Sequence, residues 1–158
     1  MSISRTILAL SLAGFAITAA AQDRRPGYGP QVTTAAAKKI AAGTLAECAK
    51  NSWNVAVAVV DNHGGLVYFE RMENTQYASN EIAINKAKTA ATYRRPTRVF
   101  MDTINKGGPA TATLGGGLTA SPGGLPIMVD GKVTGGVGVS GVTGDQDEQC
   151  AKAGLGMK

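Results

Sequence analysis

The chain has 158 residues, of which 44% are hydrophobic and 17% charged, and its formal net charge is +5. This length supports one domain with its own hydrophobic core. The basic residues are scattered, and no basic stripe is interleaved with aromatic side chains. The composition therefore argues against nucleic-acid binding, despite the positive charge.

The N-terminus has the layout of a secretory signal peptide. Arg5 precedes a short apolar run over residues 7–17, and small residues follow up to Ala21. We predict a signal peptide over residues 1–21 and a periplasmic or secreted mature protein. The apolar run is too short to span a bilayer comfortably, so we expect no membrane span after cleavage. A buried N-terminal helix is the alternative interpretation.

Cys48 and Cys150 are the two cysteines of the sequence. In an oxidising compartment they favour a single disulfide between the first and the last predicted helix. Two small buried thiols are the alternative. A structural zinc site is not indicated, because such a site needs four ligands.

Residues 22–32 are polar and rich in Gly and Pro, which predicts a flexible lead-in to a domain over residues 33–158. Thr33 or Thr34 is expected to cap a helix whose body covers residues 35–49. A β-hairpin follows, with one strand over 53–60, a turn over 61–65 and a second strand over 66–71.

Ser79 or Asn80 is expected to cap a second helix that runs through Tyr93 and ends before Pro96. One of its faces is lined with small residues that allow close packing on a sheet: Ala83, Ala87, Ala90 and Ala91. Residues 99–104 form a short element of undetermined type. The glycine-rich segments at 107–109 and 115–117 are predicted to be loops.

Asp130-Gly131 lies between two β-branched runs and predicts a type I′ hairpin turn, whose two central residues need positive φ. The second arm carries glycines at 135, 136 and 138, which indicates close approach of a ligand, a helix or another subunit. The alanine-faced helix favours packing. A terminal helix, capped by Asp145 or Asp147, is expected to reach about residue 154. The element order predicts a single α+β domain with an antiparallel sheet and packed helices.

Three motifs in this order resemble the GlcG/HbpS family of small haem-binding or haem-degrading proteins, to which the C-terminal domain of PduO-type proteins is related. They are Val59-Val60-Asp61 with Gly64-Gly65-Leu66 and Arg71; Lys86-Ala87-Lys88-Thr89-Ala90-Ala91 with Pro96-Thr97; and Gly123-Gly124-Leu125-Pro126-Ile127 through Gly138-Val139-Ser140-Gly141, with Asp147-Glu148. The resemblance implies a profilin-like layer fold and self-assembly, often into tetramers or octamers. It also implies haem as a cofactor, since some members are exported and bind haem, whereas other members are encoded beside glycolate or diol metabolism.

His63 is the only histidine and is a weak candidate for a haem iron ligand, because imidazole is the usual axial group. A solvated histidine in a turn is the plainer interpretation. Other possible axial groups, for each of which packing in the core is the plainer interpretation, are Tyr68, Tyr77, Tyr93, Met72, Met101 and Met128. Haem propionates need cations, and the candidates are Lys86, Arg94, Arg95 and Arg98. Solvated charge at a helix end is the alternative interpretation for each of them.

Gly115, Gly116 and Gly117 form a loop whose backbone N–H groups are suited to bind an anion, although a mobile loop without ligand is the plainer interpretation. The candidate ligand-binding set combines this loop with the second helix: Lys86, Thr89, Tyr93, Arg94, Gly115, Gly116, Gly117 and Gly124. Ser140 lacks the pattern of a nucleophile elbow and is predicted to be structural.

Three functions are compatible with these residues. The first is an exported oligomeric protein that binds haem or a related tetrapyrrole. The second is an enzyme or accessory protein that acts on a small hydroxy- or oxo-acid, with the carboxylate held by Lys86 and the glycine loop. The third is a purely structural oligomer module.

Overall fold

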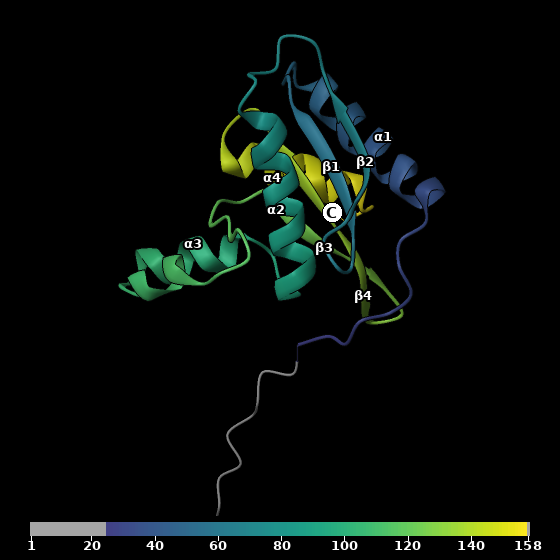
Figure 1. The fold of residues 1–158 in the computed structure, drawn as a ribbon. Coiled ribbons are helices and arrows are strands. Elements are labelled where there is room, and N and C mark those ends of the chain that lie inside the picture. Colours follow the sequence, from purple (N-terminus) through teal and green to yellow (C-terminus); the bar gives the residue numbers. More distant parts are fainter. Residues whose placement is uncertain (1–24, 158) are drawn as a thin grey trace, which may run out of the picture.

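The computed structural model describes residues 25–157, so the predicted signal peptide lies outside the described part of the chain (Figure 1). In chain order, the elements are α1 (Thr34–Lys50), β1 (Ala56–Asp61), β2 (Leu66–Arg71), α2 (Ser79–Tyr93), α3 (Arg98–Asn105), the 3-10 helix η1 (Pro109–Thr113), β3 (Gly124–Val129), β4 (Lys132–Ser140) and α4 (Gly144–Gly154). The predicted α+β class with an antiparallel sheet is confirmed.

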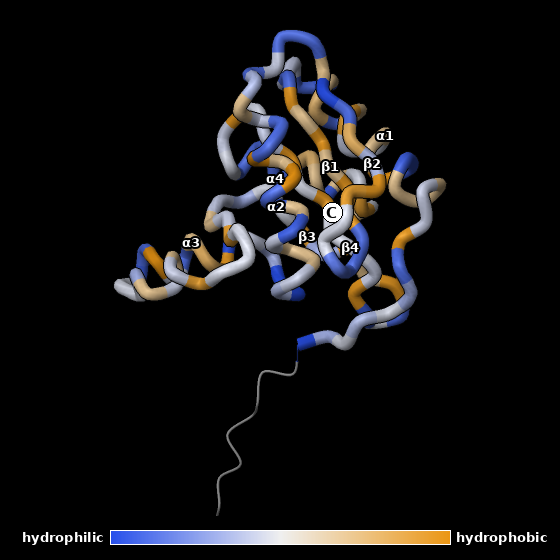
Figure 2. Tube along the Cα trace, in the orientation of Figure 1, coloured by the Kyte–Doolittle hydropathy of each residue, from blue (hydrophilic) through white to orange (hydrophobic). Residues whose placement is uncertain are grey.

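The four strands form one antiparallel sheet in the order β2-β1-β4-β3, which joins the two predicted hairpins through β1 and β4. Alternate residues of a strand point to opposite faces, and both faces of β1 are buried. Val57 and Val59 enter the core covered by α1 and α4, whereas Ala58 and Val60 face α2. The sheet therefore lies between α2 and the α1–α4 pair, and Figure 2 shows apolar residues along β1 at the centre of the molecule.

The glycines of β4 allow α2 to lie directly on the sheet. A Cβ atom on Gly138 would lie 2.1 Å from the carbonyl oxygen of Ala83, and one on Gly136 would lie 2.3 Å from that of Ala87. Both distances are far shorter than van der Waals contact, so no side chain fits at either position. These two glycines serve helix–sheet packing, as the alanine face of the second helix predicted.

The β3–β4 hairpin turn has the predicted geometry. Asp130 and Gly131 both have positive φ, at 49° and 71°, as a type I′ turn requires. The first strand is shorter than the predicted span over 53–60 and begins at Ala56. Residues 99–104 belong to the helix α3, which projects away from the sheet in Figure 1.

One of the three predicted helix caps is present in the structure. Thr33 caps α1, its hydroxyl accepting a hydrogen bond from the backbone N–H of Ala36 at 3.2 Å. The prediction of Ser79 or Asn80 as the cap of α2 is wrong, because Ser79 is already helical and the N-cap, Ala78, has no side chain that can accept a capping hydrogen bond. The prediction of Asp145 or Asp147 as the cap of α4 is also wrong. Thr143 is the N-cap and forms a reciprocal capping box with Gln146, so the Thr-x-x-Gln pattern was the stronger signal.

The end of the predicted lead-in is held against the domain rather than flexible. The carbonyl oxygen of Gly27 accepts a hydrogen bond from the Val133 N–H at 2.9 Å, and the Val32 N–H donates to the Thr134 carbonyl at 2.8 Å. The Tyr28 hydroxyl donates to a carbonyl near the end of α2 at 2.7 Å. We call residues 25–32 the strap, because they run along β4 and close over the end of α2. The composition does not reveal these contacts, since their partners lie far along the chain.

The disulfide between Cys48 and Cys150 is present, with a sequence separation of 102, and it joins α1 to α4 as predicted. Both sulfur-bearing residues are fully buried in the core beneath these two helices. Within residues 25–157, none of the helices combines the length and apolar character needed to cross a membrane.

Candidate functional site

A polar cavity of about 510 Å³ lies between the β1–β2 turn, the C-terminal half of α2 and the glycine loop at 115–117. It brings together residues from three distant parts of the sequence. The lining residues are His63, Gly64, Lys88, Thr92, Tyr93, Gly115 and Gly116. Four of them, His63, Tyr93, Gly115 and Gly116, are among the site residues that the sequence predicted.

The turn that carries His63 is organised by one carboxylate. Asp61 Oδ1 accepts hydrogen bonds from the backbone N–H groups of His63 and Gly65, both at 2.8 Å. Gly64 has a φ of 88°, and a Cβ there would touch the side chains of Lys88 and Thr92 at 3.5 and 3.4 Å. The turn is thus fixed against α2, and its exposed imidazole stands at the edge of the cavity.

The glycine loop is attached to α2 by two side chains. The Tyr93 hydroxyl donates to the Gly115 carbonyl oxygen at 2.6 Å. Thr89 Oγ1 accepts a hydrogen bond from the Thr119 N–H at 2.9 Å, just after the loop. Gly116 and Gly117 have φ of 75° and 71°, and added Cβ atoms there would meet nothing within 4 Å. The loop is therefore open to solvent between two fixed ends, and Thr89 serves to hold it.

Lys86 lies away from this cavity, in the interior. Its side chain is 2% exposed, and its ammonium lies 2.8 Å from Asp147 Oδ2 and 3.0 Å from the Val139 carbonyl oxygen. Burial raises the pKa of the Asp147 carboxyl above its ordinary value, although the charge of Lys86 opposes this. A ligand carboxylate at Lys86 would have to replace Asp147, so the geometry does not offer this ammonium as a free binding group.

The other predicted cations have protein partners. Arg94 donates to the Pro26 carbonyl oxygen at 3.1 Å and lies 5.2 Å from the ring centroid of Tyr28, so it holds the strap. Arg95 stacks 5.7 Å from the ring centroid of Phe100. Arg98 forms ion pairs with Asp145 and Glu148 at the start of α4.

Gly124 is also used internally. A Cβ on Gly124 would lie 2.5 Å from the Lys86 carbonyl oxygen, so this glycine lets β3 pass close to α2. Its backbone N–H donates to the Thr97 hydroxyl at 3.0 Å, and its carbonyl accepts from the Thr97 N–H at 3.0 Å. Both backbone groups of Gly124 are thereby committed to the connection after α2.

The remaining axial candidates lie outside the polar cavity. Tyr68 donates to Glu70 at 2.6 Å, and this bond raises the pKa of its phenol. Tyr77 is 83% exposed beneath Arg71, and Met72 packs against the core. Met101 is half-buried on α3, and Met128 lines a separate apolar groove. Of these candidates, Tyr93 alone shares the cavity with His63.

Sequence reasoning missed two features of the site. Lys88 is the cation that faces the cavity, two residues beyond the predicted Lys86. Helical geometry carried the signal, because positions 88 and 92 are four residues apart and so share a face. Asp147 is the buried partner of Lys86, and no local pattern links residues 61 positions apart. No group of three or more His, Cys, Asp or Glu side chains suited to a metal ion occurs among residues 25–157.

The architecture is that of a small α+β domain in which one helix covers one face of an antiparallel sheet and two helices cover the other. Residues 32–156 match the family model described as haem degrading protein HbpS-like, and the chain belongs to this HbpS-like family. The resemblance to the GlcG/HbpS family drawn from the motifs is therefore confirmed.

Individual relatives agree with this assignment. Protein GlcG of Escherichia coli strain K12 is 45% identical over 106 residues, which are 66% of this chain and 77% of GlcG. The crystal structure of a double mutant of Streptomyces reticuli HbpS superposes with a TM-score of 0.75 and 27% identity, covering 96% of this chain and 97% of that one. A PduOC–heme complex superposes with a TM-score of 0.73 and 25% identity, covering 80% of this chain and 94% of that one.

Proposed function

We propose that the protein binds haem or a related tetrapyrrole, in the polar cavity beside the glycine loop. The observation that carries this proposal is that His63, the only histidine, shares one cavity with the Tyr93 side chain and the Lys88 ammonium. The similarity to a structure solved as a complex with heme supports the choice of ligand.

The donor set of the cavity fits this group. An imidazole is the commonest axial ligand of haem iron, and an ammonium is suited to a propionate. Bound haem would supply redox or gas-binding chemistry at its iron. His63 would hold the iron, Lys88 would hold a propionate, and Tyr93 would keep the glycine loop in place through Gly115. The open cavity suits transient handling rather than permanent retention of the cofactor.

Hemin titration of the mature protein tests the proposal. We expect a shifted Soret band that saturates at one hemin per chain, and a different band position for His63→Ala. Tyr93→Phe removes the hydroxyl that holds Gly115 and should weaken binding roughly tenfold. Tyr77→Phe is the matched control, since Tyr77 is exposed and outside the cavity. No Soret shift at stoichiometric hemin, or identical spectra for His63→Ala and the parent, would count against this site.

Export and assembly form a separate part of the proposal. The signal-like residues 1–21 support export to the periplasm or the medium, and membership of the HbpS-like family supports a homo-oligomer. N-terminal sequencing of protein from the periplasmic fraction should begin at Gln22. Light scattering of the mature protein should give the mass of a tetramer or octamer. A cytoplasmic protein with an intact Met1, or a monomer, would contradict these expectations.

A second candidate function is binding of a small hydroxy- or oxo-acid at the same cavity. The specific observation is that Lys88 lines the same cavity as Gly115 and Gly116, whose glycine loop is exposed and suited to bind an anion through its backbone N–H groups. Glycolate or glyoxylate should then raise the melting temperature, and Lys88→Ala should abolish the shift. Lys38→Ala is the control, because Lys38 is an exposed lysine on α1. The absence of a shift with either acid would exclude this candidate.

A further inference from the structure

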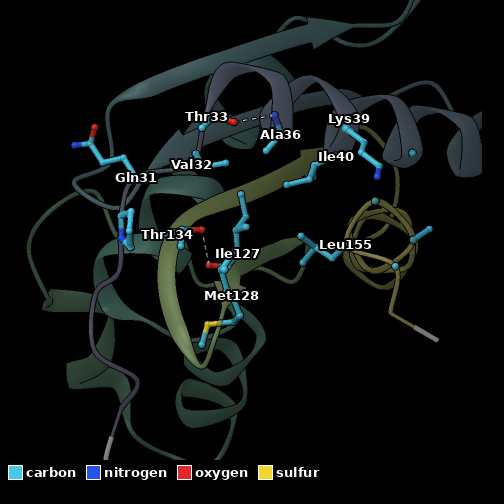
Figure 3. Close-up of a pocket in the computed structure, with 16 residues that line it drawn as sticks. Gln31, Val32, Thr33, Ala36, Lys39, Ile40, Ile127, Met128, Thr134 and Leu155 are labelled. Carbon is cyan, nitrogen blue, oxygen red and sulfur yellow. Dashed lines mark hydrogen bonds between the residues drawn. The ribbon is translucent and has the colours of Figure 1, made fainter.

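A second, larger cavity lies on the opposite side of the sheet and is apolar. It is a groove of about 690 Å³ between the end of the strap, the N-terminal half of α1, the edge strand β3 and the end of α4 (Figure 3). Figure 3 shows Ile40 descending from α1 toward Ile127 of β3, with Leu155 facing both from the end of α4. These three side chains also contact the main core, so the groove is an opening of the core to the surface.

The way α1 and α4 cross explains why the groove is open. Gly43 and Gly154 lie at the crossing, where a Cβ on Gly43 would approach the Gly154 Cα to 3.3 Å. The disulfide fixes the same two helices one turn or more further along. Because α4 ends at Gly154, which lies against Gly43, the first turns of α1 extend past the end of α4 and line the groove together with β3 and the strap.

The groove carries positive charge and no negative charge. Lys39 is the single charged residue among those that line it, and no acidic residue does. Two of the polar lining groups have partners, because the Thr33 hydroxyl accepts from Ala36 N–H and the Thr134 hydroxyl donates to the Ile127 carbonyl oxygen. The structure gives Lys39 no ion pair within residues 25–157. An apolar groove lined by one ammonium without an ion pair in the described part of the chain is complementary to an apolar molecule with one anionic end.

We infer that this groove is a binding site for an aliphatic carboxylate, with the hydrocarbon chain against Ile40, Ile127 and Leu155 and the carboxylate at Lys39. Its volume falls within the range of small-molecule sites, roughly 300–1,000 Å³, and its lining has the usual mixture of many apolar groups and few polar ones. The site is independent of the polar cavity proposed for haem, since the two share no lining residue.

Calorimetric titration with octanoate, decanoate and dodecanoate tests the inference on the mature protein. Each extension by two methylene groups should tighten binding roughly tenfold until the groove is filled. Decyltrimethylammonium has a similar chain but a positive head group, and it should bind much more weakly than decanoate. Equal binding of the two, or binding that does not depend on chain length, would overturn the inference.

Two pairs of variants locate the site. Ala36→Trp fills the groove and should abolish dodecanoate binding, whereas Ala35→Trp places the same side chain on an exposed position of α1 that does not line it. Lys39→Ala should weaken binding roughly two- to fivefold, and Lys38→Ala should leave it unchanged. Unchanged thermal unfolding would show that Ala36→Trp still folds. If Ala36→Trp binds dodecanoate like the parent, the assignment of the groove is wrong.

Two further measurements separate this inference from other occupants. Protein saturated with dodecanoate should bind hemin as tightly as free protein, because the two sites are distinct. If dodecanoate and hemin instead compete, and Ala36→Trp abolishes the binding of both, the groove is the haem site. That result would overturn the inference of a separate carboxylate site. Light scattering should give the same mass with and without dodecanoate. A lower mass with dodecanoate would instead make the groove a contact between copies of this chain.

Discussion

Lys86 and Asp147 form a buried ion pair that joins the two sides of the sheet, with their charged groups 2.8 Å apart. Lys86 belongs to α2, which covers one face, and Asp147 to α4, which packs with α1 on the other. Gly123 makes the connection possible, because a Cβ there would lie 2.8 Å from the Asp147 Cβ and 3.0 Å from Lys86 Nζ. Lys86, which the sequence analysis places in a ligand site, therefore forms a buried ion pair that links α2 on one face of the sheet to α4 on the other.

This pair predicts non-additive effects of mutation. Removing one partner leaves the other charge buried without compensation, so Lys86→Met or Asp147→Leu alone should each lower the free energy of unfolding by about 3–5 kcal/mol. The double variant should be closer to the parent than either single variant, because both desolvation penalties are removed. Urea unfolding of the four proteins measures the coupling. Strictly additive losses would contradict the assignment of the pair as a coupled unit.

The close packing of α2 on β4 predicts that Gly138 tolerates no side chain. Gly138→Ala would force a methyl group against the Ala83 carbonyl oxygen, so we expect a loss of about 1–3 kcal/mol or more in stability. Gly115→Ala is the matched control, because a Cβ at Gly115 meets nothing within 4 Å. Thermal unfolding compares the two. Equal melting temperatures would show that α2 can move away from the sheet at little cost.

Local signals account for the parts of the fold that the sequence predicted. The Asp130-Gly131 turn requires positive φ at both positions, and few other dipeptides satisfy that need. The alanines of α2 and the glycines of β4 are complementary in size, so each explains the other. Such features are encoded within a few residues, and they were sufficient to predict the class and both hairpins.

The candidate site was only partly predictable because its parts come from distant segments. The sequence placed Lys86, Thr89 and Tyr93 on one helix, but it could not tell which of them face the interior. Burial of Lys86 depends on Asp147, which arrives from α4. The apolar groove was not foreseen, because its lining comes from four separate segments of the chain: the strap, α1, β3 and the end of α4.

The disulfide predicts a redox-dependent stability. Cys48 and Cys150 are 102 positions apart in the sequence, and loss of such a bridge typically costs about 2–5 kcal/mol. Dithiothreitol should therefore lower the urea midpoint of the parent protein. The variant with both cysteines replaced by alanine should be equally destabilised and insensitive to dithiothreitol. A parent midpoint that does not respond to full reduction would show that α1 and α4 are held by packing alone.

The strap predicts a local change in hydrogen exchange when it is removed. A chain that begins at Thr33 loses Gly27, whose carbonyl oxygen accepts from the Val133 N–H, and loses Tyr28, which contacts Arg94. The Val133 amide should then exchange faster, while amides in the central β1–β4 pair keep their protection, because that pair does not depend on the strap. Mass spectrometry of peptides from the two regions measures both rates. Arg94→Ala, which leaves the backbone bonds of the strap intact, should have a smaller effect on Val133 than truncation. Faster exchange across the whole sheet would instead mean that the strap supports global stability.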